Sequence, residues 1–221
     1  MSNVVRLRGL DAPYLSIPMF VDFQKLTGTQ AYFALTQSVI PRPIAWVLSD
    51  NGNGSYNLAP FSFFNAICGD PPLVMISVGR KAEGDRKDTW VNIDERNDFV
   101  IHILPGAMAQ PMVDSAASLP HGESEVTLLN LKTQVVEGQR LPRVVGPRIA
   151  MFCTKHVIHE VGNEPQGMIL GQVRSMFIED DTATLRDGRL TIDAKKVDPL
   201  ARLGGNDYVR FGEIASYKRP L

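Results

Sequence analysis

Residues 41–89 read PRPIAWVLSDNGNGSYNLAPFSFFNAICGDPPLVMISVGRKAEGDRKDT, and this stretch decides the fold. Ile44 to Ser49 is apolar and rich in strand-forming residues. Asn51-Gly52-Asn53-Gly54 follows, with residues that accept the positive φ angles of a tight hairpin, so we expect the first two extended runs to pair antiparallel. Leu73 to Val78 is almost wholly apolar and is entered through two prolines, which predicts a buried strand.

The segment between these runs, Asn57 to Asn65, mixes small, polar and aromatic residues. Pro60 is expected to interrupt the strand ladder and to leave neighbouring backbone N–H and C=O groups free. Free groups of this kind suit a flat heteroaromatic ligand with carbonyl and nitrogen edges. An irregular edge strand with a bulge accounts for the same pattern equally well.

A charged loop, Gly79 to Thr89, comes directly before a run with apolar residues at helical spacing, Trp90 to Arg96. Asp88 or Thr89 is the expected N-cap of that helix. A helix N-terminus presents unpaired N–H groups and a partial positive charge, and four basic residues lie just before it, so the position suits a phosphate. A solvated charged loop is the plainer alternative.

Three blocks in this order, PRPIAWV, NLAPFSFFNA and DPPLVMISVG with the basic loop ending in KDT, resemble the flavin reductase-like family of FMN-binding split barrels. That family is typically associated with flavoprotein oxygenases. Asp198 to Tyr208 looks like the family's C-terminal signature, where Arg202 and Tyr208 offer a cation and an amphipathic ring. The resemblance implies a mainly β fold with a few helices, a split β-barrel of antiparallel Greek-key type. It implies one domain over residues 1–221, with an N-terminal arm (about 1–22) and a C-terminal extension (about 180–221) packed on it.

The same resemblance implies FMN as cofactor and NADH or NADPH as a transient donor. Backbone groups around Asn57 to Asn65 would bind the ring edge with Arg42 nearby, and the basic loop would surround the ribityl chain and phosphate. No residue is assigned a catalytic role, and no metal is assigned. The implied cofactor-binding residues are Arg42, Asn57, Leu58, Ala59, Pro60, Ser62, Phe63, Asn65, Ser77, Arg80, Lys87, Asp88 and Thr89.

The expected function is therefore an NAD(P)H-dependent flavin reductase that passes hydride from nicotinamide to flavin for an oxygenase or another acceptor. The alternative is an FMN-binding electron-transfer protein that a protein partner reduces, without oxidation of a nicotinamide. A barrel that has lost its flavin is the least favoured reading, because both the NLAPFSFFN block and the basic loop are present. Family members generally form homodimers, so a homodimer is expected here.

Bulk properties exclude several other classes. The chain has 23 basic and 24 acidic residues and a formal charge of −1, so no broad nucleic-acid or anionic-membrane surface is expected. It lacks a membrane-length apolar run and a secretion signal, which predicts a cytoplasmic protein. No dinucleotide fingerprint, P-loop, nucleophile elbow or zinc-peptidase motif occurs. Cys68 and Cys153 lie in apolar contexts and are expected to be reduced packing residues.

Further elements follow from local patterns. Thr29 to Val39 and Met108 to Leu119 read as helices, the second restarted at Pro111. His102 lies within an apolar strand and is expected to be a satisfied core residue. His156 and His159, three apart on a strand, should point to opposite faces and so cannot share a metal. The expected strands and turns are Phe99 to Leu104, Leu131 to Val136, a long hairpin of Arg148 to Val161 with Met168 to Glu179, and a turn at Arg186 to Arg189.

Overall fold

The structure is a computed structural model that describes residues 5–6, 19–218 and 220. The chain forms two compact units, one of residues 41–202 with 208–221 and one of residues 1–40 with 203–207. Each unit is described by itself below. The packing of the N-terminal arm on the barrel stays a prediction, and residues 1–4 and 7–18 of that arm lie outside the described residues.

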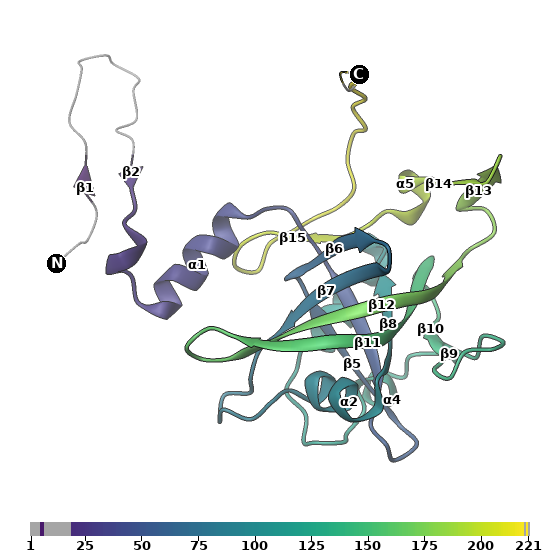
Figure 1. Ribbon diagram of the computed structural model, residues 1–221, viewed down its shortest axis with the longest axis horizontal. Helices are drawn as coiled ribbons and strands as arrows, with labels where there is room; N and C mark the ends of the chain where they lie inside the picture. The colour runs from purple at the N-terminus through teal and green to yellow at the C-terminus, as the bar shows by residue number, and fades with distance from the viewer. Residues whose placement is uncertain (1–4, 7–18, 219, 221) are drawn as a thin grey trace. The chain divides into compact units, whose positions relative to one another are not determined.

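The larger unit is built on a seven-stranded antiparallel sheet with the order β5-β4-β8-β11-β12-β7-β6 (Figure 1). The strands at its two edges, β5 and β6, are consecutive in the chain and are joined through Ser62 and Phe63. The sheet must therefore curl until its edges approach, which is the step that makes a barrel. The predicted hairpins between residues 44 and 61 and between 148 and 179 are confirmed. The strands are β4 Ala45–Asp50, β5 Tyr56–Phe61, β6 Phe64–Gly69, β7 Pro72–Val78, β8 Asp98–Ile103, β11 Ile149–Val161 and β12 Gln166–Ile178.

Apolar side chains fill both faces of the central strands. Alternate residues of β4 enter two different clusters: Trp46 and Leu48 join one, and Ala45 and Val47 join the other. A strand buried on both faces reads as a continuous apolar run, which explains the sequence from residue 44 onward. Helix α2 (Asp88–Arg96) covers the second cluster with the buried side chain of Trp90.

His102 on β8 is a satisfied core residue, as predicted. Its side chain is completely buried, and Nδ1 lies 3.0 Å from the Trp46 carbonyl oxygen. The Val144 N–H donates to Nε2 at 2.9 Å, so Nδ1 carries the proton and donates to Trp46. Burial lowers the pKa of His102 to about 4, which keeps the ring neutral.

The predicted helix from Met108 to Leu119 is wrong in its second half. A 3-10 turn (Gly106–Met108) leads into α3, which covers only Ala109–Asp114. The indole of Trp46 donates to Ser115 Oγ at 2.8 Å, and Ser115 Oγ donates to the Met112 carbonyl at 2.7 Å. These bonds hold Ser115 as the C-cap, and the chain beyond it runs as a loop.

Short elements complete this unit. A three-stranded sheet joins β16 (Tyr208–Val209), β15 (Ala201–Arg202) and β3 (Arg42–Pro43). The predicted strand at Leu131 to Val136 is reduced to two residues. The predicted turn at Arg186 to Arg189 is confirmed, because Asp187 and Gly188 both have positive φ. The remaining elements are α4 Glu125–Leu128, β9 Thr133–Gln134, β10 Arg143–Val144, β13 Ala183–Arg186, β14 Arg189–Ile192 and α5 Ala194–Val197.

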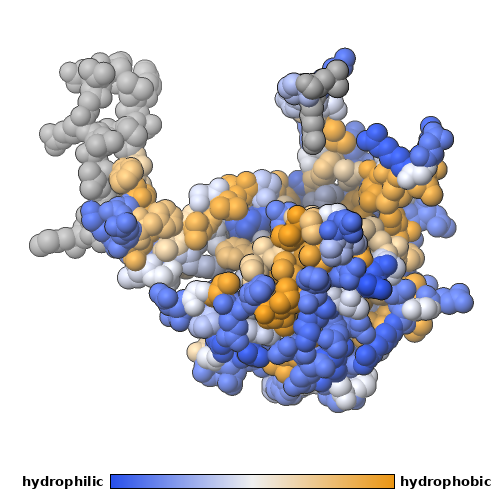
Figure 2. Space-filling model, in the orientation of Figure 1, coloured by the Kyte–Doolittle hydropathy of each residue, from blue (hydrophilic) through white to orange (hydrophobic). Residues whose placement is uncertain are grey.

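The smaller unit contains α1 (Gly28–Ser38), close to the predicted helix. Thr27 and Gln30 form a capping box at its start. Tyr32, Phe33 and Leu35 are about half exposed, so apolar surface lies open on this helix (Figure 2). Before it lie β1 (Val5–Arg6), β2 (Met19–Phe20) and a 3-10 turn (Phe23–Lys25). None of the described helices is both long and apolar enough to cross a membrane.

The two cysteines differ, and the prediction for one of them is wrong. Cys153 is buried on β11, and burial raises the pKa of its thiol to about 12. Cys68 is exposed on β6, because that strand is a sheet edge whose residues from Asn65 to Gly69 face solvent. A register shift between Ala66 and Cys68 places the bulge of this edge in β6.

Candidate functional site

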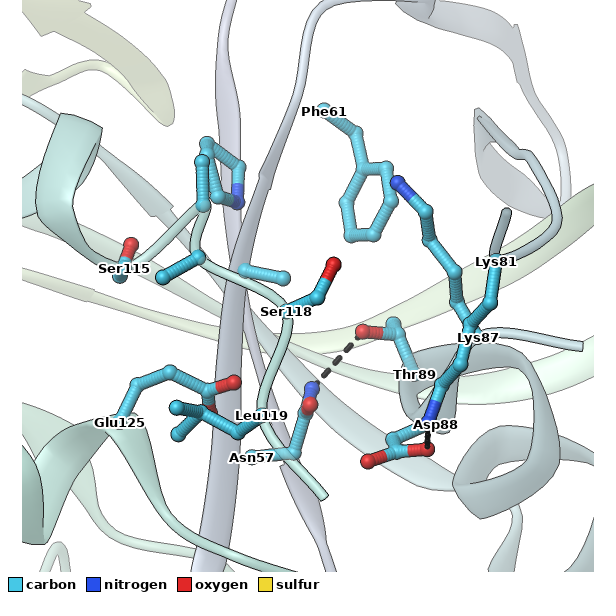
Figure 3. A pocket seen from close by; sticks show the side chains of 14 residues that line it. Asn57, Phe61, Lys81, Lys87, Asp88, Thr89, Ser115, Ser118, Leu119 and Glu125 are labelled. Atoms are coloured by element: carbon cyan, nitrogen blue, oxygen red, sulfur yellow. Dashed lines mark hydrogen bonds and ion pairs between the residues drawn. The ribbon is translucent and has the colours of Figure 1, made fainter. Parts of the chain in front are cut away.

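A pocket lies where the free edge of β5, the N-terminus of α2 and the loop after α3 meet (Figure 3). All of its walls belong to the larger unit. It combines apolar side chains with two lysines, two carboxylates and several hydroxyl and amide groups. The lining residues are Asn57, Ala59, Pro60, Phe61, Lys81, Lys87, Asp88, Thr89, Ser115, Ala116, Ala117, Ser118, Leu119 and Glu125.

The edge of β5 supplies backbone groups to one wall, although not by the predicted break at Pro60. The ladder with β4 continues through Pro60, which pairs with Trp46. On the opposite side of β5, Ser124 Oγ donates to the Tyr56 carbonyl at 2.6 Å and the Leu58 N–H donates to Glu125 Oε2 at 2.8 Å. Backbone groups alternate along a strand, so Pro60 also presents its backbone on this free side, where its missing N–H costs no ladder bond.

Asn57 ties this strand to the start of α2. Its side-chain amide is buried and donates to Thr89 Oγ1 at 2.8 Å and to Ser49 Oγ at 3.3 Å. Asn92, one turn further along α2, donates to the same Ser49 hydroxyl at 3.1 Å. The first turn of the helix is therefore held in register with β4 and β5 by hydrogen bonds between buried groups, which are costly to leave unpaired.

Helix α2 begins one residue earlier than predicted, with Lys87 rather than Asp88 or Thr89 as N-cap. Lys87 makes no side-chain capping bond, so no side chain of the cap residue occupies the N-terminal N–H groups. The Asp88 carboxylate, in the first turn, instead accepts from Lys81 Nζ at 2.8 Å and His121 Nδ1 at 3.0 Å. Burial opposes ionisation of Asp88, but these two partners outweigh it and hold its pKa below the usual value.

The two lysines of the pocket differ in their partners. The Lys81 ammonium is neutralised by Asp88, whereas the Lys87 side chain extends across the pocket toward Phe61 (Figure 3). Within the described part of the chain, Lys87 has no carboxylate at ion-pair distance. Surrounding protein atoms desolvate its ammonium and lower its pKa, although the side chain stays open to solvent. An anionic ligand would supply the missing counter-charge.

Glu125 forms the opposite wall as the first residue of α4. Its side chain is only 5% exposed. Burial raises the pKa of its carboxyl group, and the nearby Asp88 carboxylate raises it further, while the backbone N–H groups of Leu58 and Glu125 and the Lys81 ammonium act in the opposite direction. The pocket therefore has a cationic end at Lys87 and a proton-attracting carboxyl group at the other.

Six of the residues predicted from sequence line this pocket: Asn57, Ala59, Pro60, Lys87, Asp88 and Thr89. The other seven do not line it. Leu58 is in the core, Asn65 is exposed on β6, and Ser77 donates to Gln166 at 3.0 Å. Arg80 donates to the backbone carbonyls of Pro165 and Gly84 and forms an ion pair with Glu160. Arg42 donates to Ser62 at 3.3 Å and lies over the Phe63 ring.

The prediction omitted the loop from Ser115 to Leu119 and Glu125 from the site. The small residues of Ser115-Ala116-Ala117-Ser118 are a signal for a loop that lets a ligand approach closely. The prediction of a helix from Met108 to Leu119 assigned these residues to the helix instead. From its residues alone the polar run Pro120 to Glu125 predicts only a loop, and its resemblance to related flavin-binding sequences is the signal that puts it near the active face. No group of His, Cys, Asp or Glu side chains in the described residues could hold a metal.

A barrel with a free strand edge beside an uncapped helix start and an unpaired ammonium has the features of a site for a polar, anionic ligand. Residues 37–193 match the model of the flavin reductase like domain, and the chain belongs to that family. Its fold is the family's split barrel, as predicted. Family membership supports a flavin cofactor and flavin oxidoreductase chemistry.

Known proteins of similar sequence and structure agree with this assignment. Component B of nitrilotriacetate monooxygenase from Bacillus cereus is 33% identical, with a TM-score of 0.83 over 92% of this chain and 100% of that one. The 2-nitrobenzoate 2-nitroreductase of Pseudomonas fluorescens is 31% identical, with a TM-score of 0.79 over 91% and 96%. An uncharacterised protein of Halalkalibacterium halodurans is 36% identical over 199 residues, which is 88% of this chain and 93% of the relative.

Proposed function

We propose that this protein binds FMN and acts as an NAD(P)H-dependent flavin reductase, passing hydride from a nicotinamide to the flavin for an oxygenase or another acceptor. The observation that carries the proposal is the unpaired Lys87 ammonium beside the uncapped start of α2, facing the same pocket as the free edge of β5. A phosphate fits the Lys87 ammonium and the start of α2, and a heteroaromatic ring with polar edges fits the free edge of β5.

In this proposal the ligand lies along the pocket with its phosphate at Lys87 and the N-terminal N–H groups of α2. Asp88 would repel a phosphate if it were alone, but the Lys81 ammonium compensates its charge. The ring edge lies against the β5 backbone near Pro60. Asn57 and Thr89 hold the two walls together. Arg80 fixes the loop through its bonds to Pro165 and Gly84. A direct part in binding stays a prediction for Arg42, Leu58, Ser62, Phe63, Asn65, Ser77 and Arg80.

A bound flavin supplies the redox chemistry, because it accepts a hydride and passes the electrons on. The residues of this chain bind the phosphate, hold the ring edge and leave the pocket accessible to a second substrate. An oxygenase as acceptor is supported by the 33% identity to component B of the Bacillus cereus monooxygenase. A homodimer in the cytoplasm is part of the proposal, and the exposed apolar side chains of α1 are compatible with a partner subunit.

A second candidate is reduction of a nitroaromatic compound on the bound flavin, which the 31% identity to the Pseudomonas fluorescens nitroreductase favours. An FMN-binding electron-transfer protein differs from the flavin reductase and the nitroreductase because a protein partner, and not a nicotinamide, donates its electrons. Oxidation of NADH or NADPH by the purified protein, with FMN as sole acceptor and then with added 2-nitrobenzoate, distinguishes these cases. No oxidation of either nicotinamide would eliminate the reductase and leave reduction by a protein partner.

The site itself is tested by comparing FMN with riboflavin, which lacks the phosphate. Lys87→Ala should raise the Kd for FMN about tenfold, equivalent to about 1.4 kcal/mol, and leave the Kd for riboflavin nearly unchanged. Lys132→Ala removes an exposed lysine that does not line the pocket and is the matched control. An equal effect of Lys87→Ala on both ligands would show that the phosphate lies elsewhere.

A further inference from the structure

Glu125 is a buried carboxyl group in the flavin site that the proposed function leaves unused. Its side chain points into the pocket from the wall opposite Lys87 and Asp88 (Figure 3). One oxygen, Oε2, already accepts the Leu58 N–H at 2.8 Å. A proton on this carboxyl group would therefore reside on Oε1, the oxygen that does not receive the backbone N–H.

Among the described residues, the charged groups that act on Glu125 come from the other side of the pocket. Asp88 in α2 disfavours ionisation of Glu125, Lys81 favours it, and Lys87 lines the same pocket. His121 acts on Asp88 rather than on Glu125, at 3.0 Å from its carboxylate. The loop from Ser115 to Leu119 contributes no ionisable side chain. A ligand that displaces water and brings negative charge into the pocket makes the ionised form of Glu125 still less favourable.

We propose that Glu125 is protonated when flavin is bound and that its uncharged carboxyl group donates a hydrogen bond to a polar atom of the ring edge. This inference rests on the proposed function and defines the orientation in which the flavin lies in the pocket. The phosphate is attracted to the Lys87 end of the pocket, which leaves the ring edge at the Glu125 end. Binding at a pH where free Glu125 is ionised takes up one proton from the buffer.

The test uses riboflavin as well as FMN, because riboflavin has no phosphate that titrates. Wild-type affinity for riboflavin should fall as the pH is raised, since binding then requires proton uptake. Calorimetry in two buffers of different ionisation enthalpy should show that proton directly. Glu125→Gln cannot ionise, while its amide oxygen can still accept from Leu58 and its NH₂ can still donate, so it should bind riboflavin with little pH dependence. At the highest pH it should bind more tightly than the wild type.

Two further variants complete the design. Glu125→Ala removes both the donor and the ionisable group, so it should bind riboflavin with little pH dependence and about tenfold more weakly than Glu125→Gln. Glu123→Gln changes an exposed neighbour outside the pocket and should retain the wild-type profile. A Glu125→Gln variant that keeps the wild-type pH profile, or that binds as weakly as Glu125→Ala, would overturn the inference. Tight, pH-independent binding of riboflavin by the wild type would reject the protonation of Glu125 but leave the proposed function intact. Absence of flavin binding would reject both the proposed function and this inference.

Discussion

Asn57 and Thr89 are joined by a hydrogen bond of 2.8 Å from the side-chain amide to the hydroxyl, and both groups are buried. Through this bond the edge strand β5 and the first turn of α2 form one rigid corner of the pocket. Because the amide was desolvated to make the bond, losing its acceptor costs more than the bond itself contributes.

Thr89→Val keeps the shape of the side chain and removes the hydroxyl group. We expect a loss of about 1–2 kcal/mol in the free energy of unfolding, since Asn57 retains only its longer contact to Ser49. Urea denaturation followed by circular dichroism measures this change. Thr89→Ser retains the acceptor and should lose less than half as much. Equal stability of Thr89→Val and the wild type would show that the corner does not depend on this bond.

Gly167 on β12 allows Trp90 of α2 to approach the sheet. A Cβ at this position would lie 2.7 Å from Trp90 Cδ2, closer than side-chain atoms can pack. Gly167→Ala should therefore displace Trp90 and destabilise the fold by about 1–3 kcal/mol. Trp90 fluorescence and thermal unfolding report the two effects. Gly69→Ala on β6 meets no atom within 4 Å and is the control. A Gly167→Ala variant as stable as this control would contradict the prediction.

The neutrality of His102 makes stability depend on pH in a defined direction. Its pKa is lowered from 6.5 to about 4 in the folded state, so the unfolded chain binds a proton first as the pH falls. The stabilisation is complete above about pH 6.5 and is lost progressively between 6.5 and 4, amounting to about 3 kcal/mol. NMR titration of the imidazole resonances, assigned with a His102→Asn variant, measures the pKa. A His102 resonance that titrates near 6.5 would be incompatible with its burial.

Sequence reasoning succeeded where the cause is local. The turn residues Asn51 to Gly54 and the apolar run before them specify a hairpin whatever surrounds it, and the period of apolar residues after Thr89 specifies α2. His102 was also predictable, since a lone histidine in an apolar strand has few other ways to be tolerated than by satisfying both ring nitrogens.

The failures share a different cause. Helix α3 ends at Asp114 because Ser115 binds the indole of Trp46, which is 69 positions away in the chain. Cys68 is exposed because β6 lies at a sheet edge, and the position of a strand in a sheet is a property of the whole topology. Pro60 is accommodated for the same reason, since β5 is the other edge.

The pocket also combines features that have local causes with features that depend on the whole topology. The strand proposed to hold the ring and the helix start proposed to hold the phosphate both lie within residues 41–89, where alternation, turn chemistry and charge act over a few residues. The wall that faces them, with Glu125 and the loop from Ser115 to Leu119, comes from residues far along the chain that no short-range pattern connects to the first wall. Packing of the chain after β8 against β4 and β5, through the Trp46–Ser115 and Leu58–Glu125 hydrogen bonds, brings these two sets together. Only the resulting burial raises the pKa of Glu125.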